Sequence, residues 1–484
     1  MKAIPMRHVK IVATIGPATA SPEILQQLLS AGMNVARFNM SHGTREWHRA
    51  TIQTLKYLSL QLHAPTAILL DLAGPKIRVG DLPQEGRTLF RDQKVALALH
   101  TSVPPPCHTH TAVDHEIPIA LEAFPSMLQP GHMVLLDDGH ITLRILSYQK
   151  DRLICTVLAG GHITSRKGVN FPGLPLDLPG CTEKDLQDLE LGIDLQVDYL
   201  ALSFVRRPQD IHSVKSLLSK RGIHIPVIAK IERPEAVACL SEILEASDGV
   251  MIARGDLALE LSPEDVPILQ KRIIALANRM SKPVITATQM LESMTRHLVP
   301  TRAEASDVAN AVLDGTDAVM LSAETSTGTY PLETLQVMDR IIHKTESEVR
   351  YSSNDAALSN QARLAIPAAI CQTAVSLAKK IAAQAIVVFT ESGHTALALS
   401  NNRPPIPILA CTPSQFVVNR LALVWGIFPV LFNLIEETDQ RIRLAQDHLK
   451  ESGLLHTGQL IVIVTGERLG TTMGTHLIKV HIVA

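Results

Sequence analysis

The stretch VIAKIERPEAV, residues 227 to 237, ends an apolar run with a lysine and a glutamate. Side chains alternate along a strand, so Lys230 and Glu232 should point to the same side. Pro234 then opens what reads as one helix, PEAVACLSEILEAS. The pair is therefore predicted at the mouth of a strand-to-helix turn, which is where parallel α/β proteins tend to carry their chemistry.

Other polar residues follow apolar runs of the same kind: Arg37, Asn39, Ser41 and His42; Asp71; Gly255 and Asp256; Thr288; Ser322 and Glu324. Glu232 and Asp256 follow neighbouring runs and could hold a hard divalent cation, since Mg²⁺ typically takes one or two protein carboxylates. Arg37 and Lys230 would face that ion with positive charge, which suits a phosphorylated, anionic substrate. Gly255 would let backbone N–H groups approach an anion at a helix start.

Each of these signals is weak by itself. A Lys-x-Glu pair on a strand is usually a surface ion pair of little energetic value, and RGD or NMSHG alone would be an ordinary turn. Together they indicate a functional site, because polar groups follow at least five of the apolar runs, all at the same end of the predicted fold. The histidines at 108, 110 and 115 (His108, His110, His115) lack strand or helix spacing, so we expect a solvated loop there instead of a metal site.

The elements that must position these residues follow a regular order. Eight apolar runs of strand length begin at Val9, Met33, Thr66, Asp198, Ile225, Asp248, Lys282 and Asp317. Helical stretches between them have Ser, Thr or Asp near their starts and Gly at their ends. Eight strands alternating with helices predict a (β/α)₈ TIM barrel, an α/β fold whose sites lie at the carboxyl ends of the strands.

One connection is anomalous, because about a hundred residues separate the third run from the next helical pattern. That segment is rich in Pro, Gly and β-branched residues, which predicts a small all-β domain inserted after strand three, at 75–178. It could act as a lid. The barrel would then comprise 1–74 and 179–350. The polar stretch SSNDAALSNQ reads as a linker, and renewed α/β alternation predicts a separate C-terminal α/β domain at 351–484.

Composition narrows the class of partner and the compartment. A formal charge of −2 and 3% aromatic residues give no sign of nucleic acid or an anionic membrane as partner. The six cysteines form no CxxC pair, and the N-terminus lacks the pattern of a signal peptide, so we expect a cytoplasmic protein with reduced thiols. The most apolar segment, 421–435, is shorter than the roughly 20 residues that span a bilayer. It predicts a helix end followed by a strand.

The residues singled out above stand in phrases that resemble pyruvate kinases, in order, from about Arg7 to the end of the chain. These phrases include KIVATIGPAT, GMNVARFNMSHG, LLDLAGPKIR, GVNFPG, AKIERPEAV, MIARGDLALEL, KPVITATQMLESM and PTRAEASDVANAVLDGTDAVMLSAET. The last two are specific, unlike RGD. The resemblance implies transfer of the phosphoryl group of phosphoenolpyruvate to ADP, giving pyruvate and ATP in the last step of glycolysis. It also implies a β-rich lid, a C-terminal domain that often binds effectors, and a homotetramer.

The resemblance also implies roles for individual residues. The catalytic groups would be Lys230, Arg37 and Thr288, and the substrate contacts Arg37, Lys230, Gly255, Asp256 and Thr288. Mg²⁺ or Mn²⁺ would be held by Glu232 and Asp256. A monovalent-cation cage would use Asn39, Ser41, Asp71 and the carbonyl of Leu72. Nucleotide contacts would come from Asn39, His42, Arg78 and Lys167.

The sequence departs from the family pattern at a few positions. Leu72 stands where many members have Thr, and Lys76 where many have Glu. In potassium-dependent members that Glu helps to retain the ion, so Lys76 predicts substantial activity without K⁺. Ala258 replaces a usual Gly, and Arg233 with Pro follows the metal-site glutamate. No proposed catalytic group is missing.

The C-terminal domain contains TESGHT, which follows a predicted strand and opens a helix. Its effector-site candidates are Thr390, Ser392, Gly393 and Thr395. Hydroxyls and backbone N–H groups at a helix start suit one phosphate. Glu391 would repel a second phosphate, so the expected effector is a monophosphate, such as a sugar monophosphate or AMP.

Two rival interpretations remain open from the sequence. One is a magnesium-dependent, enolate-forming aldolase or lyase that acts on pyruvate, which would leave the lid and its nucleotide contacts unexplained. The other is a catalytically inactive metabolite-binding protein, which would have no reason to keep Arg37, Lys230, Glu232 and Asp256 together. A coupled assay for pyruvate from phosphoenolpyruvate and ADP separates all three.

Overall fold

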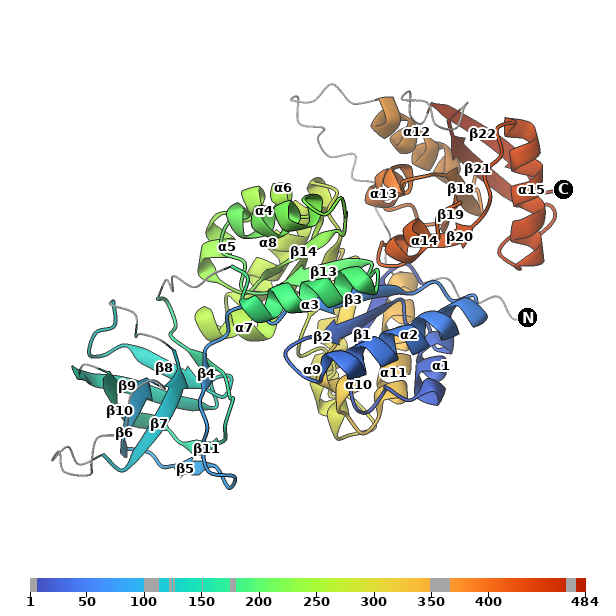
Figure 1. The fold of residues 1–484 in the computed structure, drawn as a ribbon. Helices are drawn as coiled ribbons and strands as arrows, with labels where there is room; N and C mark the ends of the chain where they lie inside the picture. Colours follow the sequence, from blue (N-terminus) through green and yellow to red (C-terminus); the bar gives the residue numbers. More distant parts are fainter. Residues whose placement is uncertain are drawn as a thin grey trace.

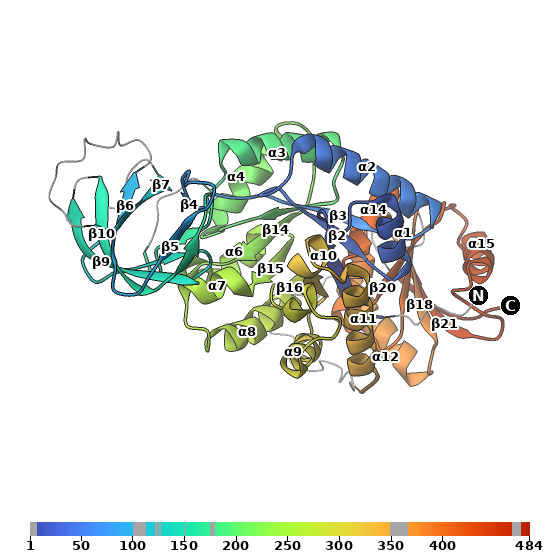
Figure 2. The same cartoon turned by 90° about the horizontal axis from the view of Figure 1, so that it is seen from below.

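A computed structural model of the chain describes residues 7–99, 113–121, 124, 127–149, 151–174, 180–348, 366–466 and 476–484. The barrel lies in the middle, with the lid and the C-terminal domain on opposite sides of it (Figures 1 and 2). The predicted linker and two of the three histidines of the predicted solvated loop, His108 and His110, lie outside the described residues. The third, His115, begins a strand of the lid.

The barrel closes through eight parallel strands in the order β1-β17-β16-β15-β14-β13-β3-β2. They are β1 (Lys10–Thr14), β2 (Val35–Asn39), β3 (Ala67–Asp71), β13 (Tyr199–Leu202), β14 (Val227–Ile231), β15 (Gly249–Ala253), β16 (Val284–Ala287) and β17 (Ala318–Leu321). Each of the eight apolar runs contains one of these strands. Such strands are covered on both faces, which is why they read as continuous apolar runs. The predicted fold class is confirmed.

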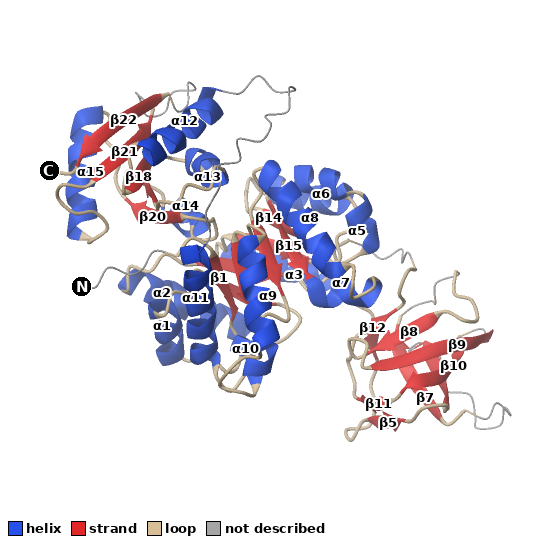
Figure 3. Ribbon diagram, turned by 180° about the vertical axis from the view of Figure 1, so that it is seen from behind, coloured by secondary structure: helices blue, strands red, loops and turns tan. Residues whose placement is uncertain are grey.

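Helices surround the barrel (Figure 3). They are α1 (Pro22–Ser30), α2 (Arg45–Gln61), α3 (Glu183–Asp194), α4 (Pro208–Ser219), α5 (Pro234–Ala238), α6 (Leu240–Ala246), α7 (Arg254–Glu260), α8 (Val266–Arg279), α9 (Arg302–Leu313), α10 (Ala323–Ser326) and α11 (Pro331–Glu348), with a 3₁₀ turn at Glu292–Thr295. Hydroxyls of Ser21, Thr182 and Thr301 cap the starts of α1, α3 and α9. The single helix predicted after Glu232 is wrong, because the backbone leaves helical geometry at Cys239 (φ −115°, ψ 37°) and separates α5 from α6.

The lid is inserted between β3 and β13. Its strands are β4 (Arg78–Val79), β5 (Arg87–Leu89), β6 (Lys94–Leu99), β7 (His115–Ala120), β8 (Met133–Leu136), β9 (Ile141–Gln149), β10 (Arg152–Ala159), β11 (Gly161–Ile163) and β12 (Val169–Asn170). They form a sheet in the order β12-β8-β9-β10-β6-β7-β4 and a smaller pair, β11-β5. The lid has a hydrophobic core of its own, which includes Val134, Leu143 and Phe171.

The C-terminal domain is a separate α/β unit. Its elements are α12 (Ile366–Lys380), β18 (Ala385–Phe389), α13 (His394–Asn401), β19 (Ile408–Thr412), α14 (Gln415–Leu421), β20 (Ile427–Leu431), α15 (Thr438–Glu451), β21 (Leu460–Thr465) and β22 (Leu477–Ile482). The sheet order is β20-β19-β18-β21-β22, and β22, which the sequence analysis missed, pairs antiparallel with β21.

This domain closes the amino end of the barrel. Leu423, just after α14, is fully buried and belongs to the same hydrophobic cluster as the inner barrel residues Val12, Leu69 and Ile285. Lys10 Nζ donates a hydrogen bond of 2.6 Å to the carbonyl oxygen of Ile427. The most apolar segment of the sequence, 421–435, thus contains the contact between the C-terminal domain and the barrel, followed by strand β20. Among the described residues, no helix is long and apolar enough to cross a membrane.

Candidate active site

Lys230 is the centre of a buried charge cluster at the carboxyl end of the barrel. Its ammonium lies 3.0 Å from Glu232 Oε1 and 3.2 Å from Asp71 Oδ1. The side chains of Lys230 and Glu232 therefore share one side, as strand alternation predicts. Burial by itself would lower the pKa of Lys230, but the charges of Asp71 and Glu232 outweigh it and raise that pKa. The ammonium stays protonated at neutral pH.

Asp71, the last residue of β3, holds a second cation. Arg37 Nε, from β2, donates to Asp71 Oδ2 at 2.7 Å, and Arg37 Nη1 donates to the hydroxyl of Thr14 at 2.9 Å. Burial would raise the pKa of Asp71, but Lys230 and Arg37 outweigh it, so the pKa is lowered and the carboxylate stays charged. Asp71 thus fixes two cations side by side.

Ser203 connects Lys230 to the backbone, and it is not among the residues predicted from the sequence. Its hydroxyl accepts a hydrogen bond of 2.7 Å from Lys230 Nζ and donates one of 2.7 Å to the carbonyl oxygen of Leu72. Ser203 stands near the end of the apolar run that begins at Asp198, so its place at the carboxyl end of a barrel strand could have been predicted from the sequence. Thr14, at the end of β1, was missed in the same way.

Glu232 has one oxygen in use and one available. Its Oε2 accepts the N–H of Phe204 at 2.7 Å, whereas Oε1 is buried and takes no hydrogen bond of good geometry, although Lys230 lies beside it. Burial raises the pKa of Glu232, Lys230 opposes that effect, and the charge of Asp256 adds to it. A buried carboxylate oxygen without a hydrogen bond, near a second carboxylate, fits a hard divalent cation.

Lys76 reaches Asp256 from the first connection to the lid. Its ammonium lies 3.4 Å from Asp256 Oδ1 and 3.3 Å from Asp138 Oδ1, at the tip of the β8–β9 hairpin of the lid. Burial lowers the pKa of Lys76, but the two carboxylates outweigh it and raise that pKa. The ion pairs of this ammonium are with Asp256 and the lid, and not with the predicted monovalent-cation cage.

Thr288 follows β16 in a strained conformation, with φ +67°. A β-branched residue rarely adopts this region, so the strain marks a fixed position. The Thr288 hydroxyl accepts the N–H of Gly255 at 2.8 Å and donates to the carbonyl oxygen of Ala287. The N–H of Gly255, which we expected to face an anion, is thus engaged by Thr288. Glu324 does not join the site, because it accepts the N–H groups of Ser322 and Leu291.

The remaining predicted residues come from both the barrel and the lid. Two members of the predicted monovalent-cation cage bond to each other, because Asn39 Oδ1 accepts the N–H of Ser41 at 3.1 Å. A third member, the carbonyl oxygen of Leu72, accepts the hydroxyl of Ser203. The pKa of His42 is lowered by burial and then by the charges of Arg78 and Arg37. On the lid, Arg78 donates to the carbonyl oxygen of Arg166, and Lys167 lies 2.8 Å from Asp137.

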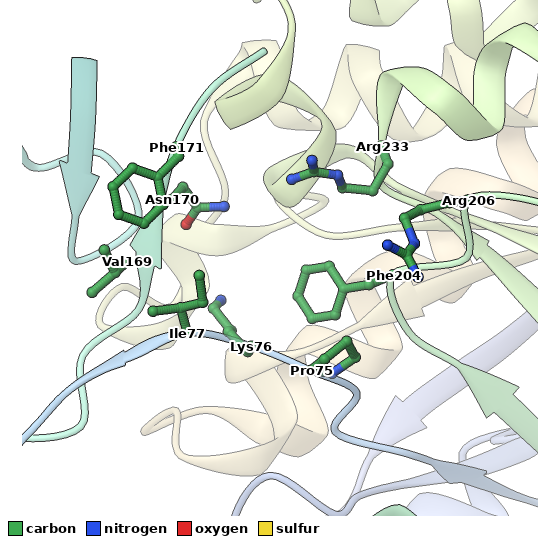
Figure 4. Close-up of a pocket in the computed structure, with 9 residues that line it drawn as sticks. All are labelled: Pro75, Lys76, Ile77, Val169, Asn170, Phe171, Phe204, Arg206 and Arg233. Carbon is green, nitrogen blue, oxygen red and sulfur yellow. The ribbon is translucent and has the colours of Figure 1, made fainter. Parts of the chain in front are cut away.

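A pocket of about 440 Å³ of empty volume, open to solvent, lies between the two connections of the lid and the barrel (Figure 4). It is lined by Pro75, Lys76, Ile77, Val169, Asn170, Phe171, Phe204, Arg206 and Arg233. This pocket was not predicted from the sequence. It adjoins the charge cluster, because Lys76 contacts Asp256 and the N–H of Phe204 holds Glu232.

The predicted effector loop precedes α13. Gly393, with φ +89°, caps the helix, and its N–H is donated to the hydroxyl of Thr390 at 2.9 Å. Ser392 Oγ lies 2.7 Å from His394 Nδ1. Thr395 is in the first turn of the helix, and Glu391 is exposed. The loop is thus ordered by its own hydroxyls.

The fold and the charge cluster define a barrel enzyme that acts on an anionic substrate at the carboxyl ends of its strands. The family model "Pyruvate kinase, barrel domain" matches residues 6–335, and "Pyruvate kinase, alpha/beta domain" matches residues 368–481. The chain is 44% identical to "Pyruvate kinase 2" of Synechocystis sp. over 480 residues, which is 99% of this chain and 79% of that relative. It is 42% identical to "Pyruvate kinase" of Geobacillus stearothermophilus over 481 residues, 99% of this chain and 81% of the relative.

The chain therefore belongs to the pyruvate kinase family. It is a phosphotransferase that transfers the phosphoryl group of phosphoenolpyruvate to ADP, giving pyruvate. The family generally uses Mg²⁺ and K⁺. The aldolase or lyase and the inactive binding protein are set aside by this assignment.

Proposed function

We propose that Lys230 is the group that stabilises both the transferring phosphoryl group and the enolate oxygen that develops as the phosphoryl leaves. The observation that supports this role is the position of its ammonium, which Asp71, Glu232 and Ser203 hold in the charged state. A cation fixed before the reaction stabilises developing charge without further reorganisation, typically by several kcal/mol.

The other residues at this end of the barrel bind the substrate and the metal. Arg37, held by Asp71, would pair with the phosphate and carboxylate of phosphoenolpyruvate, together with Gly255, Asp256 and Thr288. Thr288 would lie near the face on which the enolate receives its proton. Glu232 and Asp256 would hold Mg²⁺ or Mn²⁺, which when bound supplies positive charge to the phosphoryl and enolate oxygens.

ADP would bind between the lid, 75–178, and the barrel, 1–74 with 179–350. Arg78 and Lys167 on the lid, with Asn39 and His42 on the barrel, would contact its phosphates. A monovalent cation, if bound, would be held by Asn39, Ser41, Asp71 and the carbonyl of Leu72. Lys76 already supplies a positive charge close to Asp256, so this ion would contribute little.

We assign a regulatory role to the C-terminal domain, 351–484, with Thr390, Ser392, Gly393 and Thr395 binding one phosphate of an effector. The supporting observation is that the segment TESGHT, which contains no lysine or arginine, places the hydroxyls of Thr390, Ser392 and Thr395 at the start of α13. Titration calorimetry with a sugar monophosphate, AMP and fructose 1,6-bisphosphate tests this. Tight binding of the bisphosphate with no response to the monophosphates would contradict it. By analogy with the family, the protein would be a cytoplasmic homotetramer.

The metal assignment is tested by direct binding. We expect Glu232→Gln to weaken Mn²⁺ binding, measured from the electron paramagnetic resonance of free Mn²⁺, by about tenfold or more, since it removes one of two charged ligands. Glu264→Gln, an exposed carboxylate shortly after α7, is the matched control and should leave binding unchanged. In parallel, a coupled assay should detect pyruvate only when phosphoenolpyruvate, ADP and the divalent ion are all present. Unchanged Mn²⁺ binding in Glu232→Gln would overturn the ligand assignment.

A further inference from the structure

The lid returns to the barrel along residues 168–174. In this return segment Val169, Phe171 and Leu174 are buried in the hydrophobic core of the lid, whereas Asn170 contacts the barrel. Asn170, at the end of β12, is 7% exposed, and Phe171 is fully buried. Asn170 Nδ2 donates a hydrogen bond of 3.2 Å to Glu260 Oε1, at the end of α7. The return segment is therefore fixed by a carboxylate of the barrel.

Arg233 completes this contact. Its Nη1 donates to the same Glu260 Oε1 at 2.6 Å, and its Nη2 donates to the carbonyl oxygen of Leu174 at 3.0 Å. Figure 4 shows Arg233 from the barrel and Asn170 from the lid extending toward one another across the pocket. One buried ion pair, the Arg233–Glu260 pair, thus binds the lid at two points of its return segment.

Local helix stability does not explain an arginine at this position. Arg233 is the N-cap residue of α5, where Ser, Thr, Asp or Asn would accept a backbone N–H. An arginine cannot accept, and its side chain makes no capping bond. Arg207 stands in the equivalent place before α4, also followed by proline, but its side chain is 61% exposed. Of these two arginines, Arg233 is the one that reaches the lid.

The contacts of Lys76 are of a different kind. Lys76 meets Asp138, but the Asp138 side chain is 61% exposed, and exposed ion pairs are weak. Arg233 and Glu260 are both less than a tenth exposed, and removing one partner of a buried pair is strongly unfavourable. The Arg233–Glu260 pair is therefore expected to persist, whereas the Lys76–Asp138 contact and the partly exposed Lys76–Asp256 pair are expected to separate more easily.

We propose that Arg233 is a positioning residue: through Glu260 and the carbonyl of Leu174 it holds the return segment of the lid, and so places the nucleotide contacts Arg78 and Lys167 over the barrel. The consequence for ADP rests on the proposed function, since it assumes that these two residues meet the nucleotide. Phosphoenolpyruvate would be affected less, because all of its proposed contacts belong to the barrel.

The test compares Arg233→Met with Arg207→Met, which removes the same charge from the equivalent, exposed position. Hydrogen–deuterium exchange of residues 168–174, measured without substrate, should become at least about tenfold faster in Arg233→Met and stay unchanged in Arg207→Met. The KM for ADP should rise about tenfold, with the KM for phosphoenolpyruvate and Mn²⁺ binding within about twofold of the parent protein. Arg233→Lys, which keeps the charge with fewer donors, should recover part of both effects.

Glu260→Gln serves as a second route if Arg233→Met folds poorly, and it should reproduce the faster exchange. Unchanged exchange in either variant, or an ADP effect no larger than that of Arg207→Met, would overturn the proposal. Hydrogen–deuterium exchange is measured without substrate. Faster exchange with an unchanged KM for ADP would therefore support the role of Arg233 in attaching the lid and contradict only the assumed nucleotide contacts. Loss of Mn²⁺ binding in Arg233→Met would instead mean that the residue supports the neighbouring Glu232, and would also overturn the proposal.

Discussion

Lys230 and Lys10 are both buried lysines of the barrel, and they lie at opposite ends of its parallel sheet. Lys230 lies between the carboxylates of Asp71 and Glu232, which raise its pKa. Lys10 donates to the carbonyl oxygen of Ile427 and lies over the ring of Phe428. Burial, followed by the charge of Arg7, lowers the pKa of Lys10 to about 7.

The difference separates a functional end from a structural one. A buried ammonium remains charged where carboxylates offset its desolvation, and only a charged group can act on a phosphoryl oxygen. Where the partner is a neutral carbonyl, the same side chain fills space and satisfies a backbone acceptor. The carboxyl end of the barrel keeps its charges for ligands, whereas the amino end is closed by Leu423.

The largest effect is expected when the same substitution is made at both lysines. Lys230→Met should lower kcat by about two to three orders of magnitude or more, because it removes a charge that acts mainly in the transition state. Lys10→Met, the control, should leave kcat within about twofold, since it lies far from the reacting groups. The pyruvate assay gives kcat, and circular dichroism checks that both variants fold. More than about a tenth of the parent kcat in Lys230→Met would contradict the assigned role.

Breaking the amino end should change stability and not catalysis. Leu423→Ala removes a buried side chain from the inner cluster of the barrel and should cost about 2 kcal/mol of unfolding free energy, with a lower melting temperature. Leu431→Ala, an exposed leucine of the same domain, should melt like the parent protein. Equal melting of the two variants would show that Leu423 does not join the domains.

The charge balance of the carboxyl end is probed by potassium. Lys76→Glu would put a third carboxylate beside Asp138 and Asp256, so a monovalent cation should become necessary. The measurement is kcat in tetramethylammonium buffer with magnesium, with and without potassium chloride. For the parent protein we expect potassium to raise kcat less than about tenfold, which corresponds to about 1.4 kcal/mol. For Lys76→Glu we expect a larger increase. Stronger potassium activation of the parent protein would mean that the ion still supplies the positive charge that we assign to Lys76.

The last expected effect is a pH dependence at the amino end. The folded protein releases the proton of Lys10 near pH 7, whereas the unfolded chain keeps it to about 10.5, its ordinary value. The unfolded state therefore binds more protons between these values, and stability rises with pH there, by at most about 1.4 kcal/mol per unit. Thermal melts at pH 7, 8 and 9 should show that the stability of the parent protein increases with pH relative to that of Lys10→Met. A constant difference would mean that Glu346 and Asp317 keep Lys10 charged.

Strand positions and the charge cluster could be predicted because both depend on local rules. Apolar runs give the strands, and polar residues at their carboxyl ends must meet in a parallel barrel. The partners of Lys76 and Arg233 could not be predicted, since Asp138 and Asn170 belong to the lid and reach the barrel only through tertiary packing. The break between α5 and α6 at Cys239 could not be predicted either, because the Cys239 thiol donates a hydrogen bond to the carbonyl oxygen of Arg206, in another loop.

The position of Leu423 also constrains the order in which the chain can fold during synthesis. All eight barrel strands end by Leu321, yet the inner cluster of the barrel is completed by a side chain of the next domain. A nascent barrel that has left the ribosome without α14 and the residues after it must expose apolar side chains at its amino end. Such surfaces are where partly made chains aggregate. The C-terminal domain thus covers an apolar end of the newly made barrel, apart from any effector that it binds.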